Sequence, residues 1–344
     1  MRIIAIEEHF ITKNYMDYLR ARQDYPILKS TVDEENKKFW QLWHSPEESR
    51  PWYSEFNLGI LSDIGDERIR KMDENGIDLQ LLSFNDNIDH LNAADATDVT
   101  RRLNDELAEA VHRHASRFAG LATLAPKDPD AAAVELERAV AQLGLKGTMM
   151  LPHVEGEFID AEKYWPIFGM AARLGVPIYI HPVYPSPDRL KQYSGYPELG
   201  GALWGYGAEA SLIAMRLICS GVFDEFPELT IILGHMGEGL PFWMWRIDNR
   251  LQRPTHTTSP LCNKLKKLPS QYLRANFYFT TSGMLSQPAL LCALLTMGAD
   301  KILFATDFPH EDSAEAVQFM ATAPISEGDR EKIYHLNAER LLGL

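Results

Sequence analysis

Eight short apolar runs, rich in β-branched residues, are distributed along the chain and separated by longer segments with helical spacing. This alternation is typical of βα units around a parallel sheet. In the segment 98–114, for example, Val99, Leu103 and Leu107 recur at the spacing of one helix face. The strands that we expect are residues 2–7, 78–83, 118–123, 147–152, 177–181, 229–235, 277–282 and 301–307.

Eight such units in 344 residues favour a closed (β/α)8 barrel, or TIM barrel, over an open doubly wound sheet. Barrels use this length as one unit, so we predict a single α/β domain over residues 1–344. Two stretches exceed what a barrel needs. Residues 22–62, with three tryptophans, are expected to form a long aromatic loop insertion, and residues 184–208 a second aromatic loop. These loops are expected either to roof a pocket for a flat ligand or to pack against another subunit.

Charge and composition exclude several classes of partner. The formal net charge of −14 repels polyanions, and no basic run is longer than "KLKK", so no nucleic-acid partner is expected. No apolar run approaches the roughly 20 residues that cross a bilayer, which predicts no membrane association and a cytoplasmic location. The three cysteines, Cys219, Cys262 and Cys292, lack CxxC spacing, so neither a disulfide framework nor a thiolate metal site is expected.

Four of the eight expected strands end on residue types that bind metals. A barrel brings the carboxyl ends of its strands to one mouth, so these residues become neighbours there. On an extended strand Glu7 and His9 point to the same face, whereas Glu8 points to the other and receives no role. The strand-end residues are Glu7 and His9 (first strand), His181 (fifth), His235 (sixth) and Asp307 (eighth).

We predict one divalent metal ion bound by Glu7, His9, His181 and Asp307. Two imidazoles and two carboxylates without a thiolate suit Zn²⁺ or Mn²⁺, with Fe²⁺ as a further alternative, and ligand type does not choose among them. For Asp307 alone the alternative is a helix N-cap, and for His181 a buried structural histidine.

His235 lies in "LGHMGEGLPFWMWRIDNR", with Glu238 three residues later and Arg246 eleven residues later. Glu238 is close enough in sequence to orient the imidazole, so we interpret His235 as an acid/base or substrate-binding group. The alternatives are a fifth metal ligand or a structural role. Arg246 is expected to pair bidentately with a substrate carboxylate, or else with Asp248 as a surface ion pair.

These residues, in this order, resemble the amidohydrolase superfamily. The resemblance is strongest to its metal-dependent decarboxylases, which include γ-resorcylate and 2,3-dihydroxybenzoate decarboxylases and aminocarboxymuconate-semialdehyde decarboxylase. It extends from end to end of the chain, and the block around His235 is specific. The matching segments are "EEHF" (7–10), "HP" (181–182), "GVFDEFPELTIILGHMGEGLPFWMWRID" (221–248), "FTTSG" (279–283), "KILFATDFPHE" (301–311) and "NAERLLGL" (337–344).

The resemblance implies an amidohydrolase-type barrel that removes CO₂ without oxidation from a hydroxylated aromatic acid of the ortho-hydroxybenzoate kind. It implies the ion ligands given above, and substrate contacts from His235, supported by Glu238, and from Arg246. The ring carbon that bears the carboxylate must first be protonated, and Asp307 is the expected donor. A small aromatic acid is thus the expected substrate, and a homodimer or homotetramer the expected assembly.

Three departures from the family pattern touch the expected pocket rather than the metal site. "LPHVEG" places His153 where relatives carry Asn-Gly, and "FPHE" places His310 where a bulky apolar residue is usual. The stretch 22–62 is also longer. We predict that His153 and His310 bind substrate, the alternative being solvated loop histidines.

Two other functional classes stay open. The same barrel and ion can activate water, so a metal-dependent hydrolase of a lactone, ester or amide is the main alternative. A non-catalytic binding protein on a barrel that has lost its activity is the third, and a complete ligand set speaks against it.

Overall fold

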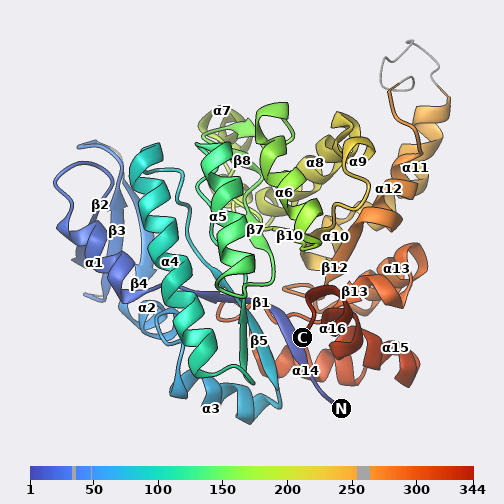
Figure 1. Ribbon diagram of the computed structural model, residues 1–344, viewed down its shortest axis with the longest axis horizontal. Helices are drawn as coiled ribbons and strands as arrows, with labels where there is room; N and C mark the ends of the chain where they lie inside the picture. The colour runs from blue at the N-terminus through green and yellow to red at the C-terminus, as the bar shows by residue number, and fades with distance from the viewer. Residues whose placement is uncertain (33–35, 48, 254–263) are drawn as a thin grey trace.

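The computed structural model describes residues 1–32, 36–47, 49–253 and 264–344 (Figure 1). Each of the eight predicted ranges contains or overlaps one strand, and neighbouring strands pair in parallel. The strands are β1 (Ile4–Phe10), β5 (Leu79–Phe84), β6 (Phe118–Gly120), β7 (Thr148–Met150), β10 (Ile178–Ile180), β11 (Ile231–Leu233), β12 (Phe277–Thr280) and β13 (Ile302–Leu303).

The eight strands form two sheets, and contacts at two places join these sheets into a closed barrel. Regular pairing gives the orders β1-β5-β6 and β13-β12-β11-β10-β7. At one place Ala122, beyond β6, bridges to Thr148 of β7. At the other, the amide of Ile6 donates to the carbonyl of Phe304 at 3.1 Å, and Glu8 bridges to Phe308. The predicted (β/α)8 barrel is therefore confirmed, and the open sheet is excluded.

Helices surround the barrel, as Figure 1 shows. The helix predicted over 98–114 begins earlier, because the side chain of Asn92 accepts from the amide of Asp95 and caps it there. No helix in the described residues is long and apolar enough to span a membrane. The helices are α1 (Lys13–Ala21), α2 (Glu55–Leu61), α3 (Asp66–Asn75), α4 (Ala93–Arg113), α5 (Pro129–Ala141), α6 (Trp165–Leu174), α7 (Pro187–Leu190), α8 (Gly205–Ser220), α9 (Val222–Glu225), α10 (His235–Glu238), α11 (Leu240–Gln252), α12 (Pro269–Asn276), α13 (Gln287–Met297), α14 (Ser313–Ala321), α15 (Glu327–Glu331) and α16 (Asn337–Leu342).

Two apolar layers follow from the period of two along each strand. On β1, Ile4 and Ile6 pack inside the barrel, whereas Ala5 faces the larger core between strands and helices. The inner layer fills the barrel below its mouth, so the inside of the barrel is apolar there. Its buried members are Ile4, Ile6, Leu79, Leu81, Ala119, Leu121, Tyr179, Ile232, Tyr278, Leu303, Ala305, Ala338 and Leu342.

The stretch 22–62 is not the irregular loop that we expected. It folds into an antiparallel sheet of β2 (Ile27–Val32), β3 (Lys38–Trp43) and β4 (Ser49–Ser54), followed by α2. Trp40 and Trp52 are buried and join the main core, so burial of these aromatic rings stabilises the insertion. In Figure 1 this sheet stands at the left edge of the barrel.

The second aromatic stretch, 184–208, contains α7 and follows a short hairpin of β8 (His153–Val154) and β9 (Glu157–Phe158). A bidentate pair of Arg189 with the buried Glu209 of α8 anchors it, at 2.7 and 3.0 Å. Cys219 and Cys292 are half-buried free thiols, and Cys262 lies outside the described residues.

Candidate metal centre

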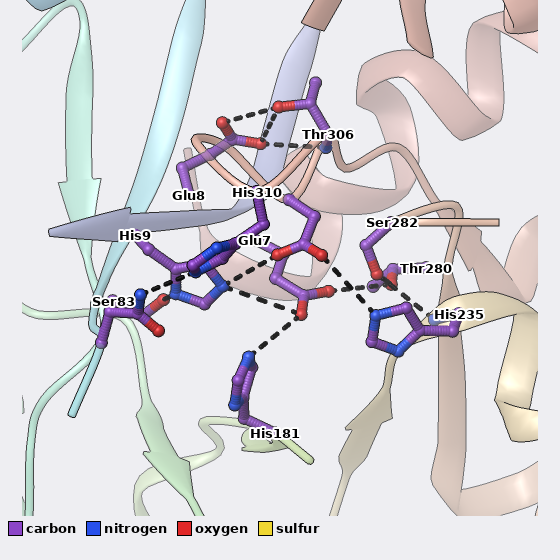
Figure 2. A network of polar contacts seen from close by, with 12 residues as sticks. Glu7, Glu8, His9, Ser83, His181, His235, Thr280, Ser282, Thr306 and His310 are labelled. Carbon is purple, nitrogen blue, oxygen red and sulfur yellow. Dashed lines mark hydrogen bonds and ion pairs between the residues drawn. The ribbon is translucent and has the colours of Figure 1, made fainter. Parts of the chain in front are cut away.

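The barrel brings all four predicted ligands together at its mouth. One ligand atom from each of Glu7, His9, His181 and Asp307 lies within 4.8 Å of the others. His9 Nε2 is 3.1 Å from Asp307 Oδ1, and Glu7 Oε1 is 3.7 Å from His181 Nε2. Figure 2 shows Glu7 and His9, both from β1, pointing toward the same region as His181.

A β-bulge in β1 sets the direction of the two ligands on that strand. Ala5 pairs with Gln80 but Glu8 pairs with Leu82, so β1 contains one more residue than β5 over this interval. Strict alternation from Ile4 and Ile6 directs Glu8 into the barrel and Glu7 outward. The extra residue reverses this order, so that Glu7 and His9 face the mouth.

The donor set fits one divalent cation. Glu7 Oε1 is buried and has no hydrogen-bond partner in the described part of the chain, whereas Oε2 accepts from the Tyr179 hydroxyl. An unpaired buried carboxylate oxygen is costly, and a cation at this position removes that cost. Burial also raises the pKa of Glu7, because the charged carboxylate is unfavourable in this buried position.

The two histidines present ring nitrogens suited to a metal. His9 Nδ1 lies 3.3 Å from the Ser83 hydroxyl oxygen, which can accept a hydrogen bond from Nδ1–H when the Nε2 lone pair binds an ion. Burial lowers the pKa of His181 well below its ordinary value, so that ring is neutral at pH 7.

His235 and Glu238 form a tight pair beside the ligands. His235 Nδ1 is 2.7 Å from Glu238 Oε1, and His235 Nε2 is 3.8 Å from Asp307 Oδ2. Burial lowers the pKa of His235, but the charge of Glu238 and the contact with Asp307 outweigh it and raise the pKa well above its ordinary value. Burial raises the pKa of Asp307, but its contacts with His235 and His9 outweigh burial and hold the pKa below the ordinary value.

Three residues of this site also have an unusual backbone conformation. His235, Glu238 and Asp307 have positive φ values of 50°, 53° and 65°. For residues other than glycine this left-handed conformation costs roughly 1 kcal/mol or more each, and such strain concentrates at functional sites.

Glu8, which received no role from the sequence, is fully buried on the outer face of the barrel wall. Its carboxylate accepts from the Thr306 amide at 3.0 Å, the Thr306 hydroxyl at 2.9 Å and the Gln80 amide at 2.9 Å. Figure 2 shows Glu8 and Thr306 above Glu7 and His9. Because Thr306 precedes Asp307, Glu8 fixes the backbone that carries a metal ligand. The presence of Glu8 and Gln80 in otherwise apolar strands is the signal that reveals this pair.

A cavity of about 2520 Å³ opens over the ligands and is lined by His181, His235 and Asp307 as well as by Arg246, His153 and His310. Arg246 is exposed to the cavity. In the described residues it makes no ion pair with Asp248, whose carboxylate instead accepts from the Ser270 amide at 3.1 Å.

The two predicted substrate histidines differ in their surroundings. His153 is buried, and both ring nitrogens contact the backbone, at the Tyr184 carbonyl (3.0 Å) and the Gly156 amide (3.2 Å). His310 is exposed toward the cavity, and desolvation by the cavity wall together with the nearby His9 lowers its pKa to about 4, so it is neutral at pH 7. His153 is therefore not a solvated loop histidine, whereas His310 is open to the cavity.

Fold and site together define a barrel enzyme with one divalent ion at the carboxyl ends of its strands. A family model described as "Amidohydrolase" matches residues 57–344. The chain therefore belongs to the amidohydrolase family, as the sequence motifs predicted.

Several similar proteins of known activity are decarboxylases of aromatic acids. The chain is 41% identical to a γ-resorcylate decarboxylase of Polaromonas sp. strain JS666 over 352 aligned positions, which cover 99% of this chain and 98% of that protein. A crystal structure of a dihydroxybenzoic acid decarboxylase from Polaromonas sp. JS666, with bound manganese and the inhibitor 2-nitroresorcinol, matches with a TM-score of 0.85 at 37% identity, covering 100% of this chain and 97% of that chain. A 5-carboxyvanillate decarboxylase from Sphingomonas paucimobilis matches with a TM-score of 0.86 at 36% identity, covering 100% and 99%.

Proposed function

We propose that this protein is a metal-dependent carboxy-lyase that removes CO₂, without oxidation, from a hydroxylated aromatic acid of the ortho-hydroxybenzoate kind. The observation that carries the proposal is the convergence of Glu7, His9, His181 and Asp307 beside the His235–Glu238 pair, at the base of one cavity. Similarity over nearly the whole chain to a γ-resorcylate decarboxylase supports the same reaction.

The chemistry requires a proton at the ring carbon before the carbon–carbon bond breaks. When bound, a divalent ion supplies positive charge that favours electron release from a phenolate into the ring. Asp307, ionised through its contacts with His235 and His9, takes the proton of the ortho hydroxyl and passes it to the ring carbon. The bond to the carboxylate then breaks, its electron pair returns to the ring, and CO₂ leaves.

His235 acts by holding Asp307 in place and in its ionised form. Its ring is oriented through Nδ1 by Glu238 at 2.7 Å, which leaves Nε2 directed at Asp307. This arrangement of carboxylate, imidazole and reacting group keeps the geometry fixed between turnovers.

Substrate contacts are proposed for Arg246, His310 and His153. Arg246 offers a planar cation to the substrate carboxylate, and it has no ion-pair partner in the described part of the chain. His310 offers a ring nitrogen to the cavity. His153 shapes the cavity wall with its ring, because both of its nitrogens contact the backbone.

The test is product analysis in D₂O with 2,6-dihydroxybenzoate and related ortho-hydroxybenzoates. We expect CO₂ release and one deuterium at the ring carbon that carried the carboxylate. Asp307→Asn is expected to lower this rate by about 10²-fold to 10⁴-fold, the usual contribution of general acid–base catalysis. Release of an acid and an alcohol or amine from a lactone, ester or amide, with no CO₂ from any benzoate, establishes the hydrolase instead.

We propose that the ion is Zn²⁺ or Mn²⁺, and that the protein is a homodimer or homotetramer working in the cytoplasm. The assembly is supported by the exposed aromatic side chains Phe242, Trp243 and Trp245 on α11, which are 75%, 52% and 77% exposed. Large apolar side chains gathered on one helix favour burial against another chain.

A further inference from the structure

Three side chains from distant parts of the chain are joined by hydrogen bonds on the cavity wall. Tyr53 lies on β4 of the inserted sheet, Asn85 directly follows β5, and His310 follows Asp307 by three residues. The Asn85 amide nitrogen lies 3.2 Å from the Tyr53 hydroxyl and 2.8 Å from His310 Nε2. The Tyr53 hydroxyl also donates to the main-chain carbonyl oxygen of Asn85, at 3.0 Å.

The donors and acceptors in these hydrogen bonds determine which ring nitrogen of His310 carries the proton. The Tyr53 hydroxyl donates its single hydrogen to the main-chain carbonyl of Asn85, so its oxygen is an acceptor toward the Asn85 side-chain amide. The Asn85 side chain must therefore present its NH₂ group there, and the second hydrogen of that group points at His310. His310 Nε2 is thus an acceptor, and the ring proton of the neutral imidazole lies on Nδ1.

His310 stands next to the metal ligands. Its ring centroid is 5.4 Å from that of His9, and it lines the cavity that contains His181, His235 and Asp307. A substrate bound at the ligand cluster therefore lies within reach of its imidazole. His310 is exposed toward the cavity, so a substrate bound there covers it and excludes water from its ring. Once covered, a neutral N–H donor discriminates strongly between an oxygen acceptor and an apolar group of the same size.

We propose that His310 is a specificity-determining residue whose Nδ1–H donates to an oxygen on the aromatic ring of the substrate, in addition to the carboxylate and its ortho hydroxyl. Tyr53 and Asn85 are positioning residues that hold its tautomer. The preferred substrates are thus ortho-hydroxybenzoates with a further oxygen substituent, such as a hydroxyl or methoxy group. This inference rests on the proposed function for the identity of the acid, but not for the tautomer.

The first experiment reads the tautomer directly. Two-bond ¹H–¹⁵N spectra of the full-length, histidine-labelled protein are expected to show His310 protonated at Nδ1, its signals being assigned by their loss in His310→Phe. His153 is the internal control, because its Nδ1 accepts from the Gly156 amide and its Nε2 donates to the Tyr184 carbonyl, the opposite tautomer. Asn85→Asp replaces the donor with an acceptor and is expected to place a proton on His310 Nε2. Protonation at Nε2 in the unaltered protein overturns the proposal.

The second experiment compares ortho-hydroxybenzoates that carry a methoxy or an ethyl group at the same ring position. At one position we expect kcat/KM to favour methoxy by about tenfold, the value of one buried hydrogen bond. His310→Phe is expected to abolish this preference and His310→Gln to retain part of it, whereas His112→Phe, an exposed position on α4, retains it in full. An unchanged preference in His310→Phe refutes the role.

Binding of the same compounds, measured by calorimetry, separates this proposal from the proposed function. If no benzoate releases CO₂ but methoxy compounds still bind more tightly through His310, the decarboxylase assignment fails and His310 recognition stands. If CO₂ is released with no methoxy preference at any position, the decarboxylase stands and the His310 proposal fails.

Discussion

Asp89, in the loop after β5, is a carboxylate buried on the wall of the active-site cavity. It is 4% exposed, and no hydrogen bond to its carboxylate occurs among the described residues. Burial raises its pKa from 3.8 to about 7, which the nearby Lys127 only partly opposes. Asp89→Asn, which replaces the carboxylate with a neutral group of the same shape, is expected to stabilise the protein at alkaline pH.

The size of the effect follows from the two pKa values. In the unfolded chain Asp89 loses its proton near its ordinary pKa, whereas in the folded protein it keeps the proton until about pH 7. Between these values the unfolded state is favoured progressively as pH rises, and above them the full cost, about 4 kcal/mol as an upper value, is present. For a chain of this length that corresponds to a rise in Tm of about 5 °C in Asp89→Asn.

The assay is thermal unfolding at pH 8 and at pH 5, with Asp188→Asn as the control. Asp188 has a side chain that is 92% exposed, so the same substitution there is expected to leave Tm unchanged. The stabilisation in Asp89→Asn should be largest at pH 8 and markedly smaller at pH 5. A Tm gain that is independent of pH, or a loss at pH 8, refutes the assignment of this cost to an ionised Asp89.

Three further substitutions test the site. Thr306→Val removes a hydroxyl bonded to Glu8 at 2.9 Å and is expected to cost about 1–3 kcal/mol of unfolding free energy and to lower kcat, whereas Thr322→Val at an exposed helix end does neither. Glu238→Gln is expected to lower kcat by roughly 10-fold to 100-fold with little change in KM, and a change confined to KM contradicts the orienting role. Arg246→Ala is expected to raise KM for the acidic substrate by roughly 10-fold to 100-fold, and an unchanged KM eliminates the carboxylate contact.

The barrel could be predicted because each of its strands has a recognisable pattern in a short stretch of sequence. Each strand is a short apolar run, and the order of runs and helices limits the topology to few choices. The convergence of His9, His181 and Asp307 followed from that topology, since these residues stand at or near the carboxyl ends of strands, whereas the direction of Glu7 did not.

The other features of the fold and the site could not be predicted, because they depend on contacts between residues far apart in the sequence. The bulge in β1 arises from its register against β5, and it decides which of Glu7 and Glu8 faces the mouth. The inserted sheet depends on pairing between strands whose sequences are interrupted by charged residues, so composition indicated only a loop. The Asn85–His310 contact joins residues 225 positions apart, and the backbone contacts of His153 are equally invisible in sequence.

The most direct test of the central claim combines metal content with turnover on one purified sample. Elemental analysis is expected to find about one Mn²⁺ or Zn²⁺ per chain, as single-ion catalysis requires. CO₂ release from ortho-hydroxybenzoates should disappear when a chelator removes the ion and return when the ion is restored. Full CO₂ release from protein that contains almost no metal contradicts the mechanism built on Glu7, His9, His181 and Asp307.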